Sequence, residues 1–193
     1  MLKNLSQYNI ILGSDSPRRK KLLSGLDLEY KVEVLPYKEK FYPKTLQREE
    51  IPVYFAQAKA KIYKEQMKND TLLITADTIV WLDGKVYGKP INKENAKEML
   101  RALSGKTHEV ITGVYLTTCE RQKTFYAVSS VRFAVLEEEE IKYYIREYQP
   151  YDKAGAYGIQ EWIGFVGVES LNGSFYNVMG LPVKMLYENL KKW

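Results

Sequence analysis

The chain has 193 residues, of which 45% are hydrophobic and 27% charged, a length and composition typical of one globular domain and unlike those of a disordered chain. The net charge of +5 comes from basic residues scattered along the chain, which favours a solvated surface over a nucleic-acid-binding patch. One cysteine and one histidine exclude an intrachain disulfide and a zinc site of the usual spacing.

The apolar runs are too short for a signal peptide core or a membrane-spanning helix. We therefore expect a cytoplasmic protein that does not associate with a membrane.

The first third of the chain alternates between strand and helix patterns. Residues 8–12 form an apolar run typical of a buried strand, and residues 13–17 are a cluster of turn and cap residues. Ser16 is a good N-cap and a proline follows it, so a helix is expected next. Residues 30–35 then alternate like a strand and lead into a loop that carries Glu39.

The middle of the chain places polar residues beside buried elements. Residues 49–70 have apolar side chains at helical spacing, with Lys59 close to the apolar face. Residues 71–76 form a nearly continuous apolar run, which predicts a strand covered on both faces and ending at Asp77. The Asp-Gly dipeptide at 83–84 predicts a hairpin turn.

Strands and helices continue to alternate in the second half. Residues 92–105 have the cap, apolar stripe and terminal glycine of a helix, and residues 110–118 and 124–136 are rich in strand-forming side chains. Four glutamates at 137–140 favour a helix start over a metal site, and residues 181–190 predict a closing helix. The pattern as a whole predicts an α/β fold with a mixed sheet.

A first candidate site lies at the start of the first predicted helix. Ser14, Ser16, Arg18 and Arg19 bring hydroxyls, guanidinium groups and helix N-terminal N–H groups into a few residues. This combination suits phosphate, because the N–H groups are oriented donors and arginine matches two phosphate oxygens at once. The same residues also describe an ordinary capped helix with solvated arginines.

A second candidate is Asp77, because ligands gather at the carboxyl ends of strands in open α/β sheets. An aspartate that only caps a turn is the alternative. The lone His108 in a strand-like run favours a structural role.

These segments together resemble the Maf family of nucleotide pyrophosphatases, also described as septum-formation inhibitors. Residues 12–19 (LGSDSPRR) are similar to the family's L-A-S-x-S-P-R-R, with Gly13 in place of alanine, and 76–80 (ADTIV) with 88–90 (GKP) resemble its central signatures. Four further short segments match in the family's order: 104–108 (SGKTH), 112–114 (TGV), 152–160 (DKAGAYGIQ) and 180–182 (GLP). The resemblance implies a single domain over residues 1–193, with an elongated mixed sheet flanked by helices and two lobes around a central cleft, as in inosine triphosphate pyrophosphatases.

The resemblance also implies roles for individual residues. Asp77 is implied to be catalytic, and Asp77 and Glu39 are implied to hold a metal ion, Glu39 less directly because its loop matches the family loosely. The implied phosphate-binding residues are Ser14, Arg19, Lys59 and Lys89. The implied determinants of base preference are Arg18, Thr78 and Gln160. Glu161 and Trp162 depart from the small residues usual after that glutamine, which leaves the shape of the base pocket open.

The implied reaction is water attack on the α-phosphorus of a nucleoside triphosphate, which yields the monophosphate and pyrophosphate. A free aspartate with a pKa near ~3.9 is a weak base towards water at ~15.7, so we expect a divalent cation, Mg²⁺ or Mn²⁺, to be required.

The amide of Gln160 offers both a donor and an acceptor, which complements the imide edge of uracil or thymine and favours dTTP and UTP. Modified pyrimidine nucleotides would fit equally, in a role that removes unwanted nucleotides from the pool. Cleavage of another nucleotide such as m7GTP, non-enzymatic regulation of division and nucleic-acid binding are the alternatives. A homodimer is expected only from the resemblance.

Overall fold

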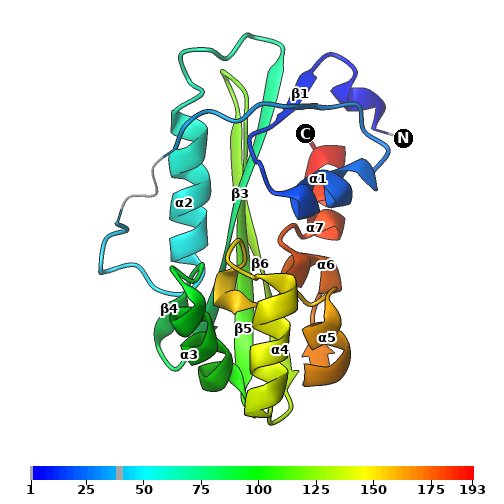
Figure 1. The fold of residues 1–193 in the computed structure, drawn as a ribbon. Coiled ribbons are helices and arrows are strands. Elements are labelled where there is room, and N and C mark those ends of the chain that lie inside the picture. The colour runs from blue at the N-terminus through cyan, green and yellow to red at the C-terminus, as the bar shows by residue number, and fades with distance from the viewer. Residues whose placement is uncertain (1, 38–40) are drawn as a thin grey trace. The chain divides into compact units, whose positions relative to one another are not determined.

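The computed structural model describes residues 2–37 and 41–193, which contain seven strands in one mixed sheet together with helices (Figure 1). The strands are β1 (Asn9–Leu12), β2 (Lys31–Val32), β3 (Thr71–Leu82), β4 (Lys85–Tyr87), β5 (Thr107–Thr117), β6 (Gln122–Phe133) and β7 (Val168–Asn172). The α-helices are α1 (Pro17–Ser24), α2 (Glu50–Lys61), α3 (Lys93–Leu103), α4 (Glu138–Tyr148), α5 (Trp162–Gly167), α6 (Phe175–Met179) and α7 (Val183–Lys191). Two 3-10 helices are η1 (Lys3–Leu5) and η2 (Ala154–Ala156).

The strand order is β2-β1-β3-β5-β6-β7, and β4 pairs with β3. Strand β1 is parallel to β2 and β3, whereas the β3–β4 and β6–β7 pairs are antiparallel. The expected α/β class with a mixed sheet flanked by helices is confirmed. Within the described residues, no helix is both long and apolar enough to cross a membrane.

The chain divides into two compact units. The first comprises Met1–Asp77, Thr112–Ala127 and Gly180–Trp193, and the second comprises Thr78–Ile111 and Val128–Met179. The implied single domain over residues 1–193 stays a prediction.

Helix α2 of the first unit is fixed against two strands. The hydroxyl of Thr75 in β3 donates a 2.8 Å hydrogen bond to the carbonyl of Ala56. At Gly113 in β5, a Cβ atom would lie 2.5 Å from the backbone nitrogen of Val53. Only a residue without a side chain allows this close approach of helix and strand. Both contacts hold the helix that carries Lys59.

The end of α2 differs from the sequence prediction. The helix ends at Lys61, whereas the sequence pattern predicts an end at residues 69–70. Tight turns follow Lys61. Tyr63 lies buried just after the helix, where its hydroxyl donates to the carbonyl of Glu33 (2.7 Å) and accepts from the backbone N–H of Leu35 (3.2 Å). These long-range contacts override the helical pattern of the local sequence.

Strand β3 also corrects a prediction. Its 12 residues run without a break from Thr71 to Leu82, so Asp77 lies within the strand and not at its carboxyl end. The β-branched and aromatic residues at 78–81 favour continued extension. Residues 71–76 are buried, whereas Asp77 and Thr78 are only half-buried. At Asp77 the burial of the side chains therefore changes, while the extended backbone of the strand continues.

Three local predictions are confirmed in the second unit. The turn between β3 and β4 has positive φ values at residues 83–84 (50° and 76°), as a two-residue hairpin requires. Asn92 caps α3 by accepting a 2.8 Å hydrogen bond from the backbone N–H of Asn95. Glu137 and Glu140 form a capping box at the start of α4, so the glutamate run begins a helix.

The C-terminal region contains elements that the sequence did not predict, namely α5, β7 and α6. They are short, and β7 is paired by β6 from a distant part of the chain. The predicted helix at 181–190 is present as α7 with slightly shifted bounds. The predicted strand at 30–35 is reduced to the two residues of β2.

The close approach at Gly113 predicts that Gly113→Ala destabilises the protein by about 1 to 3 kcal/mol, because the new methyl group overlaps the backbone of α2. Chemical denaturation of the variant measures this change. Gly88→Ala is the control, since no described heavy atom lies within 4 Å of a Cβ at Gly88, and a shift below about 0.5 kcal/mol is expected there. Equal stability of Gly113→Ala and the wild type would contradict the packing argument.

Candidate functional site

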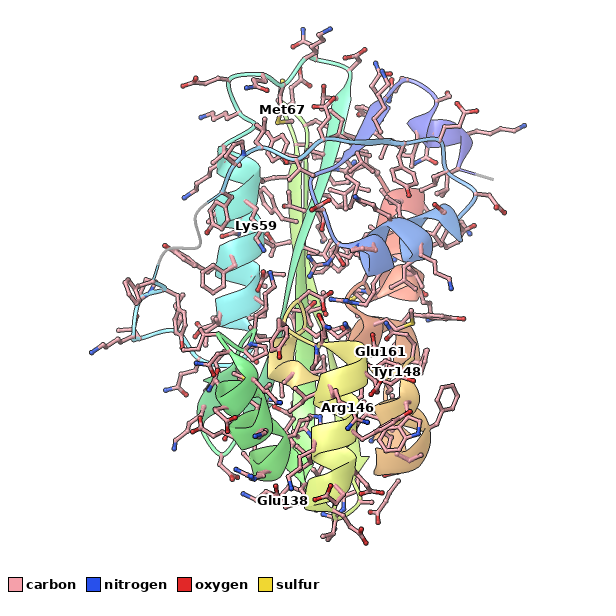
Figure 2. The ribbon with its side chains drawn as sticks, viewed as in Figure 1. Lys59, Met67, Glu138, Arg146, Tyr148 and Glu161 are labelled. Atoms are coloured by element: carbon pink, nitrogen blue, oxygen red, sulfur yellow. The ribbon has the colours of Figure 1, made fainter. Side chains whose placement is uncertain are left out.

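The first unit brings a lysine and an aspartate into direct contact. Lys59 in α2 (Figure 2) forms an ion pair through Nζ with Oδ1 of Asp77 in β3. The two side chains are only 17% and 13% exposed, so this pair is screened less by solvent than a surface pair. The lysine Nζ also lies 5.9 Å from the ring centroid of Tyr37. The family resemblance implies functions for both charged residues, and the structure shows that the two side chains form a pair.

The turn between β1 and α1 is also an organised cluster. The Ser14 hydroxyl accepts from the backbone N–H of Ser16 (3.3 Å) and from Nη1 of Arg19 (3.4 Å). Ser16 caps α1 as expected, accepting from the backbone N–H of Arg19. Nε of Arg19 donates 2.8 Å to the carbonyl of Gly180, which starts the Gly-Leu-Pro segment. Two motifs that are far apart in sequence therefore meet within the first unit.

The remaining expected site residues in the described chain are Arg18, Thr78, Lys89 and Gln160. Arg18 lies half-buried in α1 of the first unit. Thr78 directly follows Asp77 in β3, and because the strand is continuous their side chains leave it on opposite faces. Lys89 is exposed after β4.

Gln160, in the second unit, lies just before α5. Its Oε1 atom is buried and has no hydrogen-bond partner among the described residues. A buried acceptor without a partner is unusual in a folded protein and suits a group that meets a ligand.

Two segments of the second unit that carry expected motifs are joined by their backbones. The N–H of Gly155 donates 3.0 Å to the carbonyl of Gly88. Gly155 has φ 68°, and a Cβ there would lie 2.8 Å from Cγ2 of Val80. The Gly-Lys-Pro and Asp-Lys-Ala-Gly segments are thereby held together beside β3.

Glu39 lies outside the described residues, and the implied convergence of the site residues on one cleft stays a prediction. Among the described residues, no group of three or more His, Cys, Asp or Glu side chains could hold a metal ion by itself.

Sequence reasoning missed a polar network beside Gln160. Tyr144 in α4 and Lys153 both contact the carboxylate of Glu161, at a position where the resemblance implied a small residue. That departure was the one available signal. Nothing local to Tyr144 indicates a partner 17 residues away.

His108 belongs to the core of the second unit, which agrees with the structural role favoured from sequence. It is 1% exposed, its Nε2 atom lies 2.8 Å from the hydroxyl of Tyr157, and its ring packs edge-on against Phe133. Burial lowers the pKa of His108 from 6.5 to about 4.

Comparison with known proteins gives a consistent result. The family model described as Maf-like protein matches residues 9–193. A dTTP/UTP pyrophosphatase of Phocaeicola vulgatus is 62% identical over 192 residues, and one of Bacteroides thetaiotaomicron is 61% identical over 192 residues. Each alignment covers 100% of this chain and 100% of the relative.

Among solved structures, a nucleoside-triphosphatase, or dITP/XTP pyrophosphatase, of Mycobacterium abscessus has a TM-score of 0.38 and 13% identity. The match covers 66% of this chain and 75% of that one. A similarity at this level carries no argument about activity.

The pKa of His108 predicts a pH-dependent stability. Because the folded-state pKa is depressed, the unfolded chain takes up a proton that the native protein excludes. Stability is therefore full above about pH 6.5 and falls towards pH 4, by about 3 kcal/mol at most. Urea denaturation between pH 7 and 4.5 measures the loss. His108→Gln, which cannot titrate, should lose less stability than the wild type over this range. Equal losses in the two proteins would contradict the conclusion that protonation of His108 causes the loss.

Proposed function

Because this chain belongs to the Maf family, we propose that it hydrolyses dTTP and UTP at the α-phosphate, releasing the nucleoside monophosphate and pyrophosphate. The observation that carries the proposal is the identity of about three residues in five to dTTP/UTP pyrophosphatases over the full length of both chains. Such an enzyme removes triphosphates from the nucleotide pool. Modified pyrimidine nucleotides are included in the proposed substrate class, the cytoplasm is the proposed location, and a homodimer is the proposed assembly.

Asp77 is the proposed catalytic group. Its carboxylate is held by Lys59 from the neighbouring helix, and its position within a strand limits its movement. A rigid carboxylate can orient an attacking water and receive its proton. The ammonium group of Lys59 lies next to this acid, which supports its proposed contact with the phosphates.

A divalent cation fits this donor set. Mg²⁺ is usually bound through one or two carboxylates, with phosphate oxygens of the substrate completing its shell. Asp77 provides such a carboxylate, and Glu39 is the proposed second. When bound, the ion would neutralise phosphate charge and lower the pKa of bound water.

The phosphates are proposed to contact Ser14, Arg19, Lys59 and Lys89. Arg19 keeps a fixed orientation because its Nε and Nη1 atoms donate to Gly180 and Ser14. A guanidinium that is already oriented loses less conformational entropy on binding an anion.

The base is proposed to be recognised by Gln160, with Arg18 and Thr78 as further determinants of preference. The buried and unpaired Oε1 atom of Gln160 supports this role. An amide that accepts from the N3–H of uracil or thymine and donates to a neighbouring carbonyl would satisfy both groups. Guanine presents two adjacent donors on the same edge and would leave the amide donor unmatched.

Asp77→Asn is expected to lower pyrophosphate release from UTP by about 10²-fold or more, because the amide cannot accept the proton. Turnover is measured by a coupled pyrophosphate assay, with thermal unfolding to verify the fold. Asp83→Asn is the matched control, since it removes an exposed carboxylate paired with Lys106 at the end of the same strand and should leave turnover unchanged. Undiminished turnover in Asp77→Asn would count against the catalytic role.

Turnover is also expected to depend on an added divalent cation. Excess EDTA should abolish pyrophosphate release, and Mg²⁺ or Mn²⁺ should restore it, because the carboxylate alone is too weak a base for water. The stability of the protein in EDTA, followed by circular dichroism, separates loss of activity from unfolding. Full activity in EDTA would remove the cation from the proposal.

A further inference from the structure

We propose that Tyr144, Lys153 and Glu161 form a positioning network that holds the segment around Gln160 and thereby sets the affinity for the nucleotide base. This inference rests on the proposed function of Gln160 in base recognition. The three side chains come from α4, from the loop before η2 and from the N-cap of α5, all within the second unit. Glu161, the N-cap residue of α5, is labelled in Figure 2.

The network is centred on the carboxylate of Glu161, which is only 20% exposed. Its Oε2 atom accepts a short hydrogen bond from the hydroxyl of Tyr144, and its Oε1 atom lies 3.1 Å from Nζ of Lys153. Lys153 is 9% exposed and also pairs with Asp152 at 2.7 Å. A partly buried carboxylate and a buried ammonium group are each stabilised by a partner, so the members of the network depend on one another.

The same network fixes the backbone next to Gln160. The Tyr144 hydroxyl, while donating to Glu161, accepts a 2.9 Å hydrogen bond from the backbone N–H of Gly158. The backbone N–H of Glu161 donates 3.0 Å to the carbonyl of Gly158. One phenol group therefore connects the residues on both sides of Gln160.

Two glycines make this arrangement compact. A Cβ at Gly158 would lie 2.8 Å from Cδ of Glu161, so the carboxylate packs directly on the glycine backbone. A Cβ at Gly164 would lie 1.8 Å from the carbonyl oxygen of Ile159, which places the first turn of α5 against the segment. Side chains at these positions would push the segment away from the network.

Tyr144 is suited to be the donor in this network. It is fully buried, and burial together with the Glu161 carboxylate raises its pKa well above the ordinary value for a phenol. The hydroxyl thus keeps its proton at neutral pH. Its ring stacks on that of Tyr148, at 5.1 Å between centroids, which restricts rotation of the phenol ring.

The consequence for function is preorganisation of the Gln160 amide. Its neighbours Ile159 and Glu161 are held by backbone and side-chain contacts, while its own Oε1 atom is buried without a partner. A recognition group whose supports are rigid binds more tightly because less freedom is lost on binding. Tyr144 and Glu161 are then positioning residues that never need to touch the nucleotide.

The test is a double-mutant cycle between Tyr144→Phe and Gln160→Ala, with the Kd for UMP measured by calorimetry. Tyr144→Phe should weaken UMP binding about tenfold in the wild-type background, the effect of losing one hydrogen bond to a charged group. It should have less than about a twofold effect when Gln160 is already alanine, because contacts in one network are not additive. An equal effect in both backgrounds, or no effect in the wild-type background, would overturn the proposal.

Tyr148→Phe is the matched control, because it removes a hydroxyl from the same helix and keeps the ring stacking with Tyr144. It should leave the Kd for UMP unchanged, and weakening equal to that of Tyr144→Phe would overturn the proposal. If Tyr144→Phe does not fold, Glu161→Gln replaces it in the same cycle with the same expected coupling, since it keeps the size of the side chain and removes its charge.

Kinetics with UTP provide an independent measurement. A positioning role predicts a higher KM with kcat nearly unchanged, whereas partial unfolding would lower kcat at constant KM. A fall in kcat alone would overturn the proposal. If the wild type cleaves neither UTP nor dTTP, the proposed function fails, while the UMP cycle still tests the network. Wild-type protein that cleaves UTP but binds no UMP would overturn the proposed effect of the network on base affinity and leave the proposed function intact.

Discussion

The ion pair between Lys59 and Asp77 constrains the architecture of the first unit. Both side chains are largely buried, and a buried charge that loses its partner is strongly unfavourable. Helix α2 must therefore remain where its lysine reaches β3. Gly113 allows this position because it has no side chain, and the hydroxyl of Thr75 reinforces it through a hydrogen bond to the helix. The pairing of the proposed catalytic acid with Lys59 therefore follows from how the helix docks on two strands.

Features with local causes could be predicted from the sequence. The Asp-Gly turn, the Asn92 cap and the glutamate run before α4 each depend on a few adjacent residues, and each lies where the pattern indicated. Features decided by distant partners could not be predicted. Helix α2 ends early because buried Tyr63 bonds the chain near Glu33, and β7 exists because β6 pairs with it.

The candidate site also combines features that could be predicted from the local sequence with contacts that could not. Its motifs supplied the residue types, including Ser14, Lys59 and Asp77, but no spacing could show that Lys59 and Asp77 touch or that Arg19 reaches Gly180. The network around Glu161 was even harder to predict from the sequence. Its tyrosine and lysine partners lie elsewhere in the sequence, and the only local indication was a glutamate where the resemblance implied a small residue.

The unbroken course of β3 has a consequence for how such an enzyme can diversify. Neighbouring residues of an extended strand face opposite sides, so the side chains of Asp77 and Thr78 have different surroundings although one peptide bond joins them. A replacement at position 78 leaves the lysine that accompanies Asp77 in place. Because Thr78 is a proposed determinant of base preference and Asp77 is the proposed catalytic group, the strand separates the two proposed roles, and a single substitution can change one without the other.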